Sequence, residues 1–288
     1  MFLPRKLLEE KLRQFLAEDL GQGDITTTLI VQPESTTEAK VITKETGVAA
    51  GIEEATILLE SLGLKIETSV ADGKNIEKRQ VLMKIVGDTR TILSVERTLL
   101  NILSRMSGIA TVTRKLTEKL RKAGLKTKVA CTRKTAPGLL YFDKKAVWIG
   151  GGDTHRLHLD DMILIKDNHI AVAGNIANAI KKVKEKASFS KKIEVEVTEV
   201  EDVLTAAKAY VEIIMLDNFS PKQIEKAVKL LKKEGFFGKV LLEASGGITE
   251  KNIIEFASTG VDIVSLGELT DSPRTLDISL EIAKTSKR

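Results

Sequence analysis

The sequence is poor in the residues on which disulfide-rich, membrane-spanning and nucleic-acid-binding proteins depend. Its 288 residues include one Cys and one Trp, and aromatic residues make up 4%. A single cysteine excludes an internal disulfide and is compatible with a reducing cytoplasm. No stretch approaches the roughly 20 apolar residues that cross a bilayer, and residues 1–6 lack the apolar run of a secretory signal. We therefore expect a cytoplasmic protein with a core of Ile, Leu, Val and Ala.

Charged residues, in contrast, are abundant in both signs. Lys and Arg number 45 and Asp and Glu 40, which gives a net charge of +5. Many lysines lie in helical runs such as residues 181–186, which is typical of solvated helix faces. Because no aromatic side chains alternate with them, the basic residues do not predict nucleic-acid binding.

From residue 127 onward, short apolar segments alternate with amphipathic ones. The apolar segments predict strands over residues 128–132, 162–166, 193–198, 213–217, 240–245 and 262–267, with one more near 147–149. The intervening segments predict helices over about 171–186, 200–210, 221–234 and 250–258. Alternating units of this kind imply a parallel sheet with right-handed crossovers. Six or seven strands fit a closed or nearly closed β/α barrel better than a doubly wound sheet.

Residues 1–107 have a different pattern, which predicts a separate N-terminal domain before a barrel domain over 108–270. Helices are expected over 5–18, 53–62 and 94–108, the last linking the two domains, and a β-hairpin over about 71–83. The hairpin is superficially like a lipoyl-carrier turn but has no carrier lysine at its tip. The C-terminal segment, about 271–288, is predicted to form a helix that packs back on the first domain.

Polar residues follow one predicted barrel strand after another. In β/α barrels the active site lies at the carboxyl ends of the strands. These ends carry Thr132, Arg133, Lys134, Lys166, Glu196, Asp217, Ser245 and Gly267. Isolated charges at the ends of apolar strands are costly to bury, so their recurrence predicts a functional site. The alternative is a set of paired structural charges at the barrel rim.

The charges in this set divide by sign. The four cations Arg133, Lys134, Arg156 and Lys166 can hold carboxylates or phosphates, and arginine suits bidentate contact. The acids Glu196 and Asp217 suit Mg²⁺, which takes few protein ligands and keeps phosphate oxygens and waters. The sequence therefore predicts a phosphorylated, Mg²⁺-associated substrate and a second anion.

Two small-residue turns follow late strands and predict a phosphate site. Residues 245–247 (Ser-Gly-Gly) and 267–269 (Gly-Glu-Leu) allow backbone N–H groups to approach an anion closely.

Among the histidines, His155 beside Arg156 is a candidate for binding an acidic substrate, whereas His158 and His169 are expected to be structural. The spacing of His155 and His158 lacks the further ligands of a zinc site. Cys131 and Trp148 are expected in the core.

The sequence resembles nicotinate-nucleotide pyrophosphorylases (carboxylating), also called quinolinate phosphoribosyltransferases. The resemblance covers nearly the whole chain, in the runs EDLGQGDITT (18–27), ERTLLNILSRMSGIAT (96–111), TRKTAPGLL (132–140), GGGDTHRLHLDDMILIKDNHI (150–170), IEVEVTEVED (193–202), IMLDNFSP (214–221), LEASGGIT (242–249) and TGVDIVSLGELTDSPRTLDISL (259–280). It implies an N-terminal α/β sandwich and an incomplete, TIM-like β/α barrel. It also implies a reaction of NAD biosynthesis: quinolinate and 5-phosphoribosyl-1-pyrophosphate give nicotinate mononucleotide, pyrophosphate and CO₂. His158 departs from the residue types expected in many relatives.

The resemblance also implies residue roles. Arg133, Lys134, His155, Arg156 and Lys166 would hold the carboxylates and nearby phosphates, next to Thr132. Glu196 and Asp217 would face the ribose and Mg²⁺. Ser245, Gly246, Gly247, Gly267, Glu268 and Leu269 would cradle the 5′-phosphate. Arg97 would enter the neighbouring active site of a homodimer or higher assembly.

Three other functions are consistent with parts of the pattern. A paralogue associated with molybdenum transport resembles the same family, but the full set of cations favours a dicarboxylate acceptor. A Schiff-base aldolase would use Lys166 as its nucleophile. A non-enzymatic binding protein would take up the ligands without releasing pyrophosphate.

Overall fold

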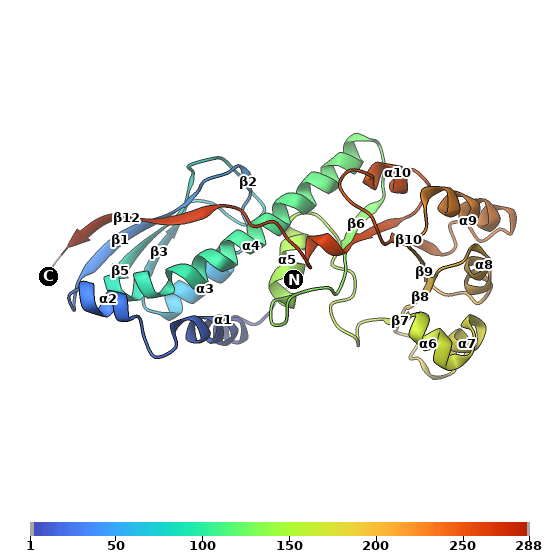
Figure 1. Cartoon of the computed structure of the whole chain (residues 1–288), viewed down its shortest axis with the longest axis horizontal. Helices are drawn as coiled ribbons and strands as arrows, with labels where there is room; N and C mark the ends of the chain where they lie inside the picture. The colour runs from blue at the N-terminus through green and yellow to red at the C-terminus, as the bar shows by residue number, and fades with distance from the viewer. Residues whose placement is uncertain (1–2, 287–288) are drawn as a thin grey trace. The chain divides into compact units, whose positions relative to one another are not determined.

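The computed structural model describes residues 3–286 and divides into two compact units, shown in Figure 1. The first unit contains the chain up to Arg114, the segment Tyr141–Gly151 and the chain from Pro273. The second contains Lys115–Leu140 and Gly152–Ser272. Among the described residues, no helix combines the length and apolarity needed to span a membrane.

The first unit is built on a four-stranded antiparallel sheet. Its strands are, in spatial order, β12 (Ile278–Ser286), β1 (Thr36–Thr43), β5 (Val81–Asp88) and β3 (Lys65–Thr68). Burial alternates residue by residue along β1, because successive side chains of a strand point to opposite faces. A short pair, β2 (Gly47–Val48) and β4 (Asn75–Ile76), lies outside this sheet.

The C-terminal helix predicted over about 271–288 is wrong: the tail forms β12 and pairs with β1. Residues 287–288 lie outside the described residues. In the tail, Ile278, Leu280 and Ile282 alternate with polar residues, which is a strand pattern. The segment does pack back on the first unit, by adding an edge strand to its sheet.

Helices accompany this sheet in the first unit (Figure 1). They are α1 (Arg5–Leu20), α2 (Ile25–Ile30), α3 (Ile52–Ser61), α5 (Leu140–Ile149) and the start of α4 (Thr89–Lys122). The hydroxyl of Thr111 on α4 accepts the Val48 N–H at 2.8 Å and so ties β2 to the helix. The strand predicted near residues 147–149 is wrong, since these residues end α5. The predicted core residue Trp148 is 56% exposed.

The second unit is built on a six-stranded parallel sheet. Its strands are, in spatial order, β6 (Lys128–Cys131), β11 (Ile263–Leu266), β10 (Leu241–Ser245), β9 (Ile213–Asp217), β8 (Ile193–Val197) and β7 (Ile163–Ile165). All six were predicted, with ends that agree within two residues. Within the described part of the chain β6 and β7 are the two edges, so the sheet forms an incomplete barrel.

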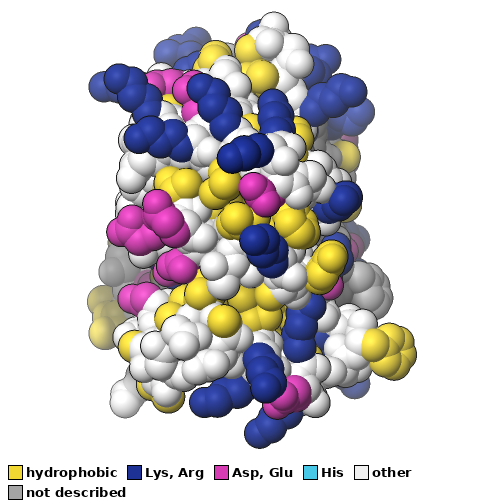
Figure 2. Space-filling model, turned by 90° about the vertical axis from the view of Figure 1, so that its right-hand side faces the viewer, with side chains coloured by type: hydrophobic (Ala, Val, Ile, Leu, Met, Phe, Trp, Pro, Cys, Tyr) yellow, Lys and Arg dark blue, Asp and Glu magenta, His cyan; other side chains and the backbone are white. Residues whose placement is uncertain are grey.

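Helices connect these strands as α6 (Asp167–Ala173), α7 (Ile176–Lys186), α8 (Val200–Lys208), α9 (Pro221–Lys233) and α10 (Ile253–Ala257), with a 3₁₀ turn η1 (Gly267–Leu269) after β11. The helix predicted over 171–186 is interrupted at Gly174, whose φ of +94° ends α6. At α9, Ser220 caps the helix and Gln223 completes a capping box. Figure 2 shows Lys and Arg side chains scattered over one face among acidic and apolar ones, without a single basic patch on that face.

Candidate functional site

A cavity of about 600 Å³ opens at the carboxyl ends of the six parallel strands. It lies within the second unit. The polar residues predicted at the strand ends line it together: Thr132, Arg133, Lys134, His155, Arg156, Lys166, Glu196, Asp217, Ser245, Gly246, Gly247, Gly267 and Glu268. Of the predicted barrel residues, only Leu269 is absent from the lining, because it is buried in η1. Arg97 is exposed on α4 in the first unit.

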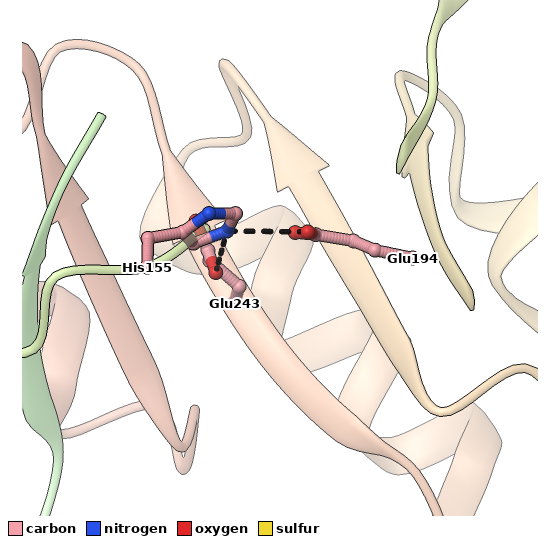
Figure 3. Close-up of side chains that lie close together, drawn as sticks. All are labelled: His155, Glu194 and Glu243. Atoms are coloured by element: carbon pink, nitrogen blue, oxygen red, sulfur yellow. Dashed lines mark ion pairs between the residues drawn. The ribbon is translucent and has the colours of Figure 1, made fainter. Parts of the chain in front are cut away.

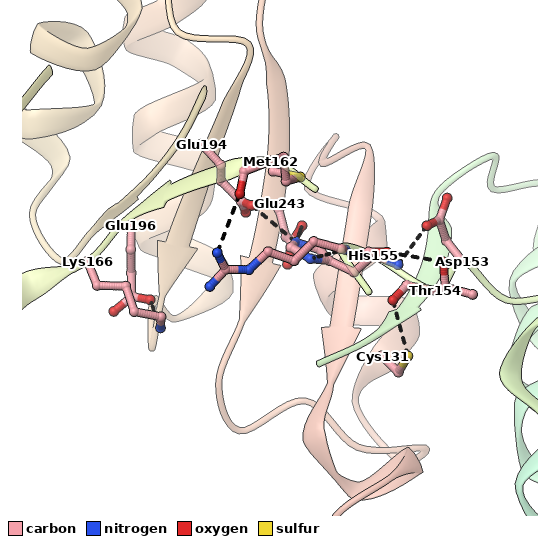
Figure 4. Close-up of polar contacts among 10 residues, drawn as sticks. Cys131, Asp153, Thr154, His155, Met162, Lys166, Glu194, Glu196 and Glu243 are labelled. Carbon is pink, nitrogen blue, oxygen red and sulfur yellow. Dashed lines mark hydrogen bonds and ion pairs between the residues drawn. The ribbon is translucent and has the colours of Figure 1, made fainter. Parts of the chain in front are cut away.

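A cation and an acid of the predicted set form an ion pair in this cavity. Lys166 follows β7, and its Nζ lies 2.6 Å from Oε2 of Glu196 on β8 (Figure 4). The Lys166 side chain is 44% exposed and that of Glu196 10%. Because the lysine is half exposed, the pair is accessible to an incoming ligand and adds little to stability.

Asp217, at the end of β9, is the second acid of the cavity. Burial raises the pKa of its carboxyl, and the nearby Glu196 carboxylate raises the pKa further. The cations Lys166 and Lys134 oppose this shift. Because the carboxylates of Glu196 and Asp217 repel each other, a divalent cation bound between them would stabilise the charged form of both. The oxygen-only donor set suits Mg²⁺.

Asn218, which no sequence argument identified, orders this end of the sheet. Its Nδ2 donates to Oδ2 of Asp217 at 2.7 Å, and its backbone N–H donates to the Ser245 carbonyl at 2.8 Å. It adopts a left-handed φ of +57°, which Asn tolerates better than most residues. The sequence signal was the Asp217-Asn218 pair directly after a buried strand.

The turn after β10 requires its glycines for different reasons. Gly246 has φ +92°, and a Cβ there would lie 2.2 Å from Oδ1 of Asn218. Gly247 has φ +63° but open space around its missing Cβ. At the second turn, a Cβ on Gly267 would lie 3.0 Å from Oδ2 of Asp271. The first turn therefore brings bare backbone to the cavity wall, as a phosphate site needs.

Two arginines that line the cavity, Arg133 and Arg156, lie close enough for their positive charges to interact. Burial lowers the pKa of Arg156, whose residue is 8% exposed, and the positive charge of Arg133 lowers the pKa further. Mutual repulsion between the guanidinium groups means that an anion placed between them would be held strongly. The Glu194 carboxylate opposes these two effects and raises the pKa of Arg156.

His155 lines the cavity, but its ring is turned toward the sheet. Its Nε2 lies 3.1 Å from Oε2 of Glu194 and 3.3 Å from Oε2 of Glu243, and both glutamates are fully buried (Figure 3). Burial lowers the pKa of His155, but the two carboxylates outweigh burial and raise it. Burial also raises the pKa of Glu194. Sequence reasoning missed both glutamates.

The other singled-out residues have structural contacts. His158 and His169 are exposed, and Nδ1 of His169 accepts the Lys166 N–H at 2.9 Å. The described residues that could hold a metal together do not include His158. Cys131 is buried, with its Sγ 3.5 Å from the Thr154 carbonyl, as a core residue would be (Figure 4).

Comparisons with known proteins agree over most of the chain. The family model of the quinolinate phosphoribosyl transferase N-terminal domain matches residues 24–107, and that of the C-terminal domain matches residues 109–281. The chain is 43% identical to a probable nicotinate-nucleotide pyrophosphorylase [carboxylating] of Methanothermobacter thermautotrophicus, covering 94% of this chain and 97% of that one. It is 44% identical to the protein of that name from Methanocaldococcus jannaschii, covering 95% and 96%. The solved nicotinate-nucleotide pyrophosphorylase of Francisella tularensis superposes with a TM-score of 0.89 at 38% identity, covering 98% of each chain.

Proposed function

The chain belongs to the quinolinate phosphoribosyltransferase family, and from this membership we propose how its cavity divides between two substrates. It is a carboxylating nicotinate-nucleotide pyrophosphorylase, a pentosyltransferase of NAD biosynthesis. It joins quinolinate to 5-phosphoribosyl-1-pyrophosphate and forms nicotinate mononucleotide, pyrophosphate and CO₂. The observation that carries the assignment of the cavity is that predicted cations, acids and glycine turns line one 600 Å³ space.

The cationic side of the cavity is assigned to quinolinate. Arg133 and Arg156 bind its adjacent carboxylates, with Lys134 and Lys166 completing the positive charge and His155 and Thr132 lining the space beside them. Guanidinium groups suit planar, bidentate carboxylate recognition. Fixing both carboxylates aims the ring nitrogen at the second substrate and reduces the entropic cost of the attack.

The acidic side and the glycine turns are assigned to the phosphoribosyl group. Glu196 and Asp217 face the ribose and would hold Mg²⁺, partly through water. When bound, the ion would neutralise charge on the departing pyrophosphate. Backbone N–H groups of residues 245–247 and 267–269 receive the 5′-phosphate.

The residues of the cavity suit a dissociative displacement. As pyrophosphate leaves C1 of the ribose, positive charge develops at that carbon, and the carboxylates of Glu196 and Asp217 stabilise it. The new bond leaves the pyridine nitrogen positively charged, which lets the adjacent carbon lose CO₂. The bond electrons left on that carbon then take up a proton.

Arg97 is assigned to a neighbouring subunit's cavity. It is exposed on α4, so its side chain is accessible to a second chain. On this proposal the active protein is a cytoplasmic homodimer or a higher assembly. Mixing Arg97→Ala with Lys166→Ala subunits tests it: mixed dimers should recover activity that neither variant has alone. Mixtures without recovery would contradict the exchange.

The assignment of the two sides is tested by separate kinetics. We expect Arg133→Ala and Arg156→Ala to raise KM for quinolinate more than KM for phosphoribosyl pyrophosphate, and Asp217→Asn to do the reverse and weaken Mg²⁺ dependence. A uniform loss for both substrates in all three variants would contradict the division. Glu185→Gln, at an exposed position on α7, is the matched control.

The Schiff-base alternative predicts borohydride trapping on Lys166, and the binding-protein alternative predicts binding without pyrophosphate release.

A further inference from the structure

Two buried glutamates of the parallel sheet, of which Glu243 lines the cavity, have no role in the functions assigned so far. Glu194 on β8 and Glu243 on β10 are fully buried, yet none of their four carboxylate oxygens has a hydrogen-bond partner among the described residues. One oxygen of each, Oε2, lies near Nε2 of His155, at 3.1 and 3.3 Å. Two carboxylates buried at one place are very costly unless a positive group or a proton offsets them. The structure therefore requires a partner for them, and His155 is the residue that lies between them (Figure 3).

The hydrogen bonding of the ring indicates that this partner is a proton on Nε2. A metal ion at Nε2 would need the ring proton on Nδ1. However, Nδ1 accepts the backbone N–H of Arg156 at 2.8 Å, so its lone pair is in use. The Oε2 atoms of the two glutamates lie 3.1 and 3.3 Å from Nε2, where they can accept from a ring proton but would repel a lone pair. The ring therefore carries its proton on Nε2, facing Glu194 and Glu243.

The loop that carries His155 is fixed at two places. Asp153 ties it to β6, because the Asp153 N–H donates to the Val129 carbonyl at 2.7 Å and Oδ1 of Asp153 accepts the His155 N–H at 2.9 Å (Figure 4). His155 itself has a left-handed φ of +52°, a conformation that a non-glycine residue keeps only when its surroundings impose it. The ring, held between two strands, is the second fixed point.

Arg156 is the residue that this arrangement places. Its backbone N–H donates to Nδ1 of His155, and it directly follows His155, the residue with the left-handed φ. Glu194 also acts on the guanidinium by charge, opposing the lowering of its pKa by burial. Loss of either glutamate would free the ring, relax the loop and move the guanidinium group in the cavity.

We propose that Glu194 and Glu243 are positioning residues that set the Arg156 guanidinium for an acceptor carboxylate, acting through the Nε2–H of His155. The proposal rests on the assignment of Arg156 to the acceptor. It predicts that the two glutamates determine affinity for an adjacent dicarboxylate and hardly affect the phosphoribosyl half of the site.

The test compares Glu243→Ala with the conservative Glu243→Gln, whose amide oxygen still accepts from Nε2. We expect Glu243→Ala to weaken binding of benzene-1,2-dicarboxylate and raise KM for quinolinate by about tenfold or more, the size of a lost hydrogen bond to a charged group. KM for phosphoribosyl pyrophosphate should change by less than about threefold. Glu243→Gln should recover most of the affinity, and Glu185→Gln is the control. Equal changes in both KM values, or no rescue by Gln, would overturn the proposal.

A spectroscopic measurement on the wild-type protein does not depend on activity or on variants that fold poorly. The ¹⁵N shifts of the His155 ring, assigned by their absence in His155→Asn, should show a protonated Nε2. An unprotonated Nε2, or a stoichiometric metal ion that Glu243→Ala loses, would overturn the proposal. If wild-type protein binds the dicarboxylate but makes no nucleotide, the proposed function fails, while the binding and ring measurements still decide the positioning role.

Discussion

The glycine turn after β10 offers a matched pair of substitutions, Gly246→Ala and Gly247→Ala. Both residues have a positive φ, so each alanine costs about 1–2 kcal/mol of backbone strain. Only at Gly246 does the new Cβ also meet a neighbour, Oδ1 of Asn218 at 2.2 Å and its backbone N at 3.0 Å. Asn218 must move, which breaks its 2.7 Å hydrogen bond to the Asp217 carboxylate.

The expected losses differ accordingly. A hydrogen bond to a charged group contributes about 1.5–3 kcal/mol, so Gly246→Ala should lose about 2.5–5 kcal/mol in total and Gly247→Ala about 1–2 kcal/mol. At about 1.4 kcal/mol per tenfold change, kcat/KM for phosphoribosyl pyrophosphate should fall about 10- to 150-fold further in Gly246→Ala than in Gly247→Ala. Steady-state kinetics with thermal unfolding as a control for folding provides the assay. Equal losses in the two variants would refute the role given to Asn218.

Three further predictions concern buried groups and a helix cap. Burial raises the pKa of Tyr141 to about 12, so in Tyr210→Phe, which leaves Tyr141 as the one tyrosine, the phenolate absorbance should rise near pH 12. The contribution of Tyr141 to stability is present below pH about 10 and is lost between pH 10 and 12. A midpoint of the phenolate titration near pH 10 would contradict its burial. Lys145→Met leaves the fully buried Glu54 without its 2.6 Å partner and should lower the free energy of unfolding by about 3–5 kcal/mol, with partial recovery in Lys145→Met/Glu54→Gln; denaturant unfolding without such coupling would contradict the pair. Ser220→Ala removes the cap of α9 and should cost about 1 kcal/mol in the same assay, so an unchanged midpoint would show that the cap is dispensable.

Much of the second unit could be predicted from sequence because its strands are short, apolar and followed by polar residues. The strand predicted over 213–217 agrees with β9 at both ends. Where prediction failed, the local signal was ambiguous. Residues 147–149 are apolar enough for a strand, but they complete a helix that begins at Leu140. Residues 278–282 carry the alternation of a strand, and the whole segment 278–286 completes the sheet of the first unit by pairing with β1, a long-range contact that the sequence does not show.

The residues of the candidate site at the strand ends could be predicted from the sequence, whereas Glu194 and Glu243, earlier in their strands, were missed. Glu194 and Glu243 lie two residues before Glu196 and Ser245, so strand alternation places each pair on one face of the sheet. That spacing was a usable signal. What it could not give is the ring of His155 between the glutamates, because the ring arrives from a loop with a left-handed residue. Asn218 was equally hidden, since its importance depends on a glycine 28 positions later in the chain.

The most direct measurement mixes the protein with quinolinate, phosphoribosyl pyrophosphate and Mg²⁺ and follows nicotinate mononucleotide and CO₂. Wild-type protein should form both in equal amounts, and omission of Mg²⁺ or the substitution Lys166→Ala should abolish or sharply reduce both. A folded wild-type preparation that forms neither product, including at high temperature, would contradict the account. Product formation that persists in Lys166→Ala would contradict the placement of the reaction in this cavity.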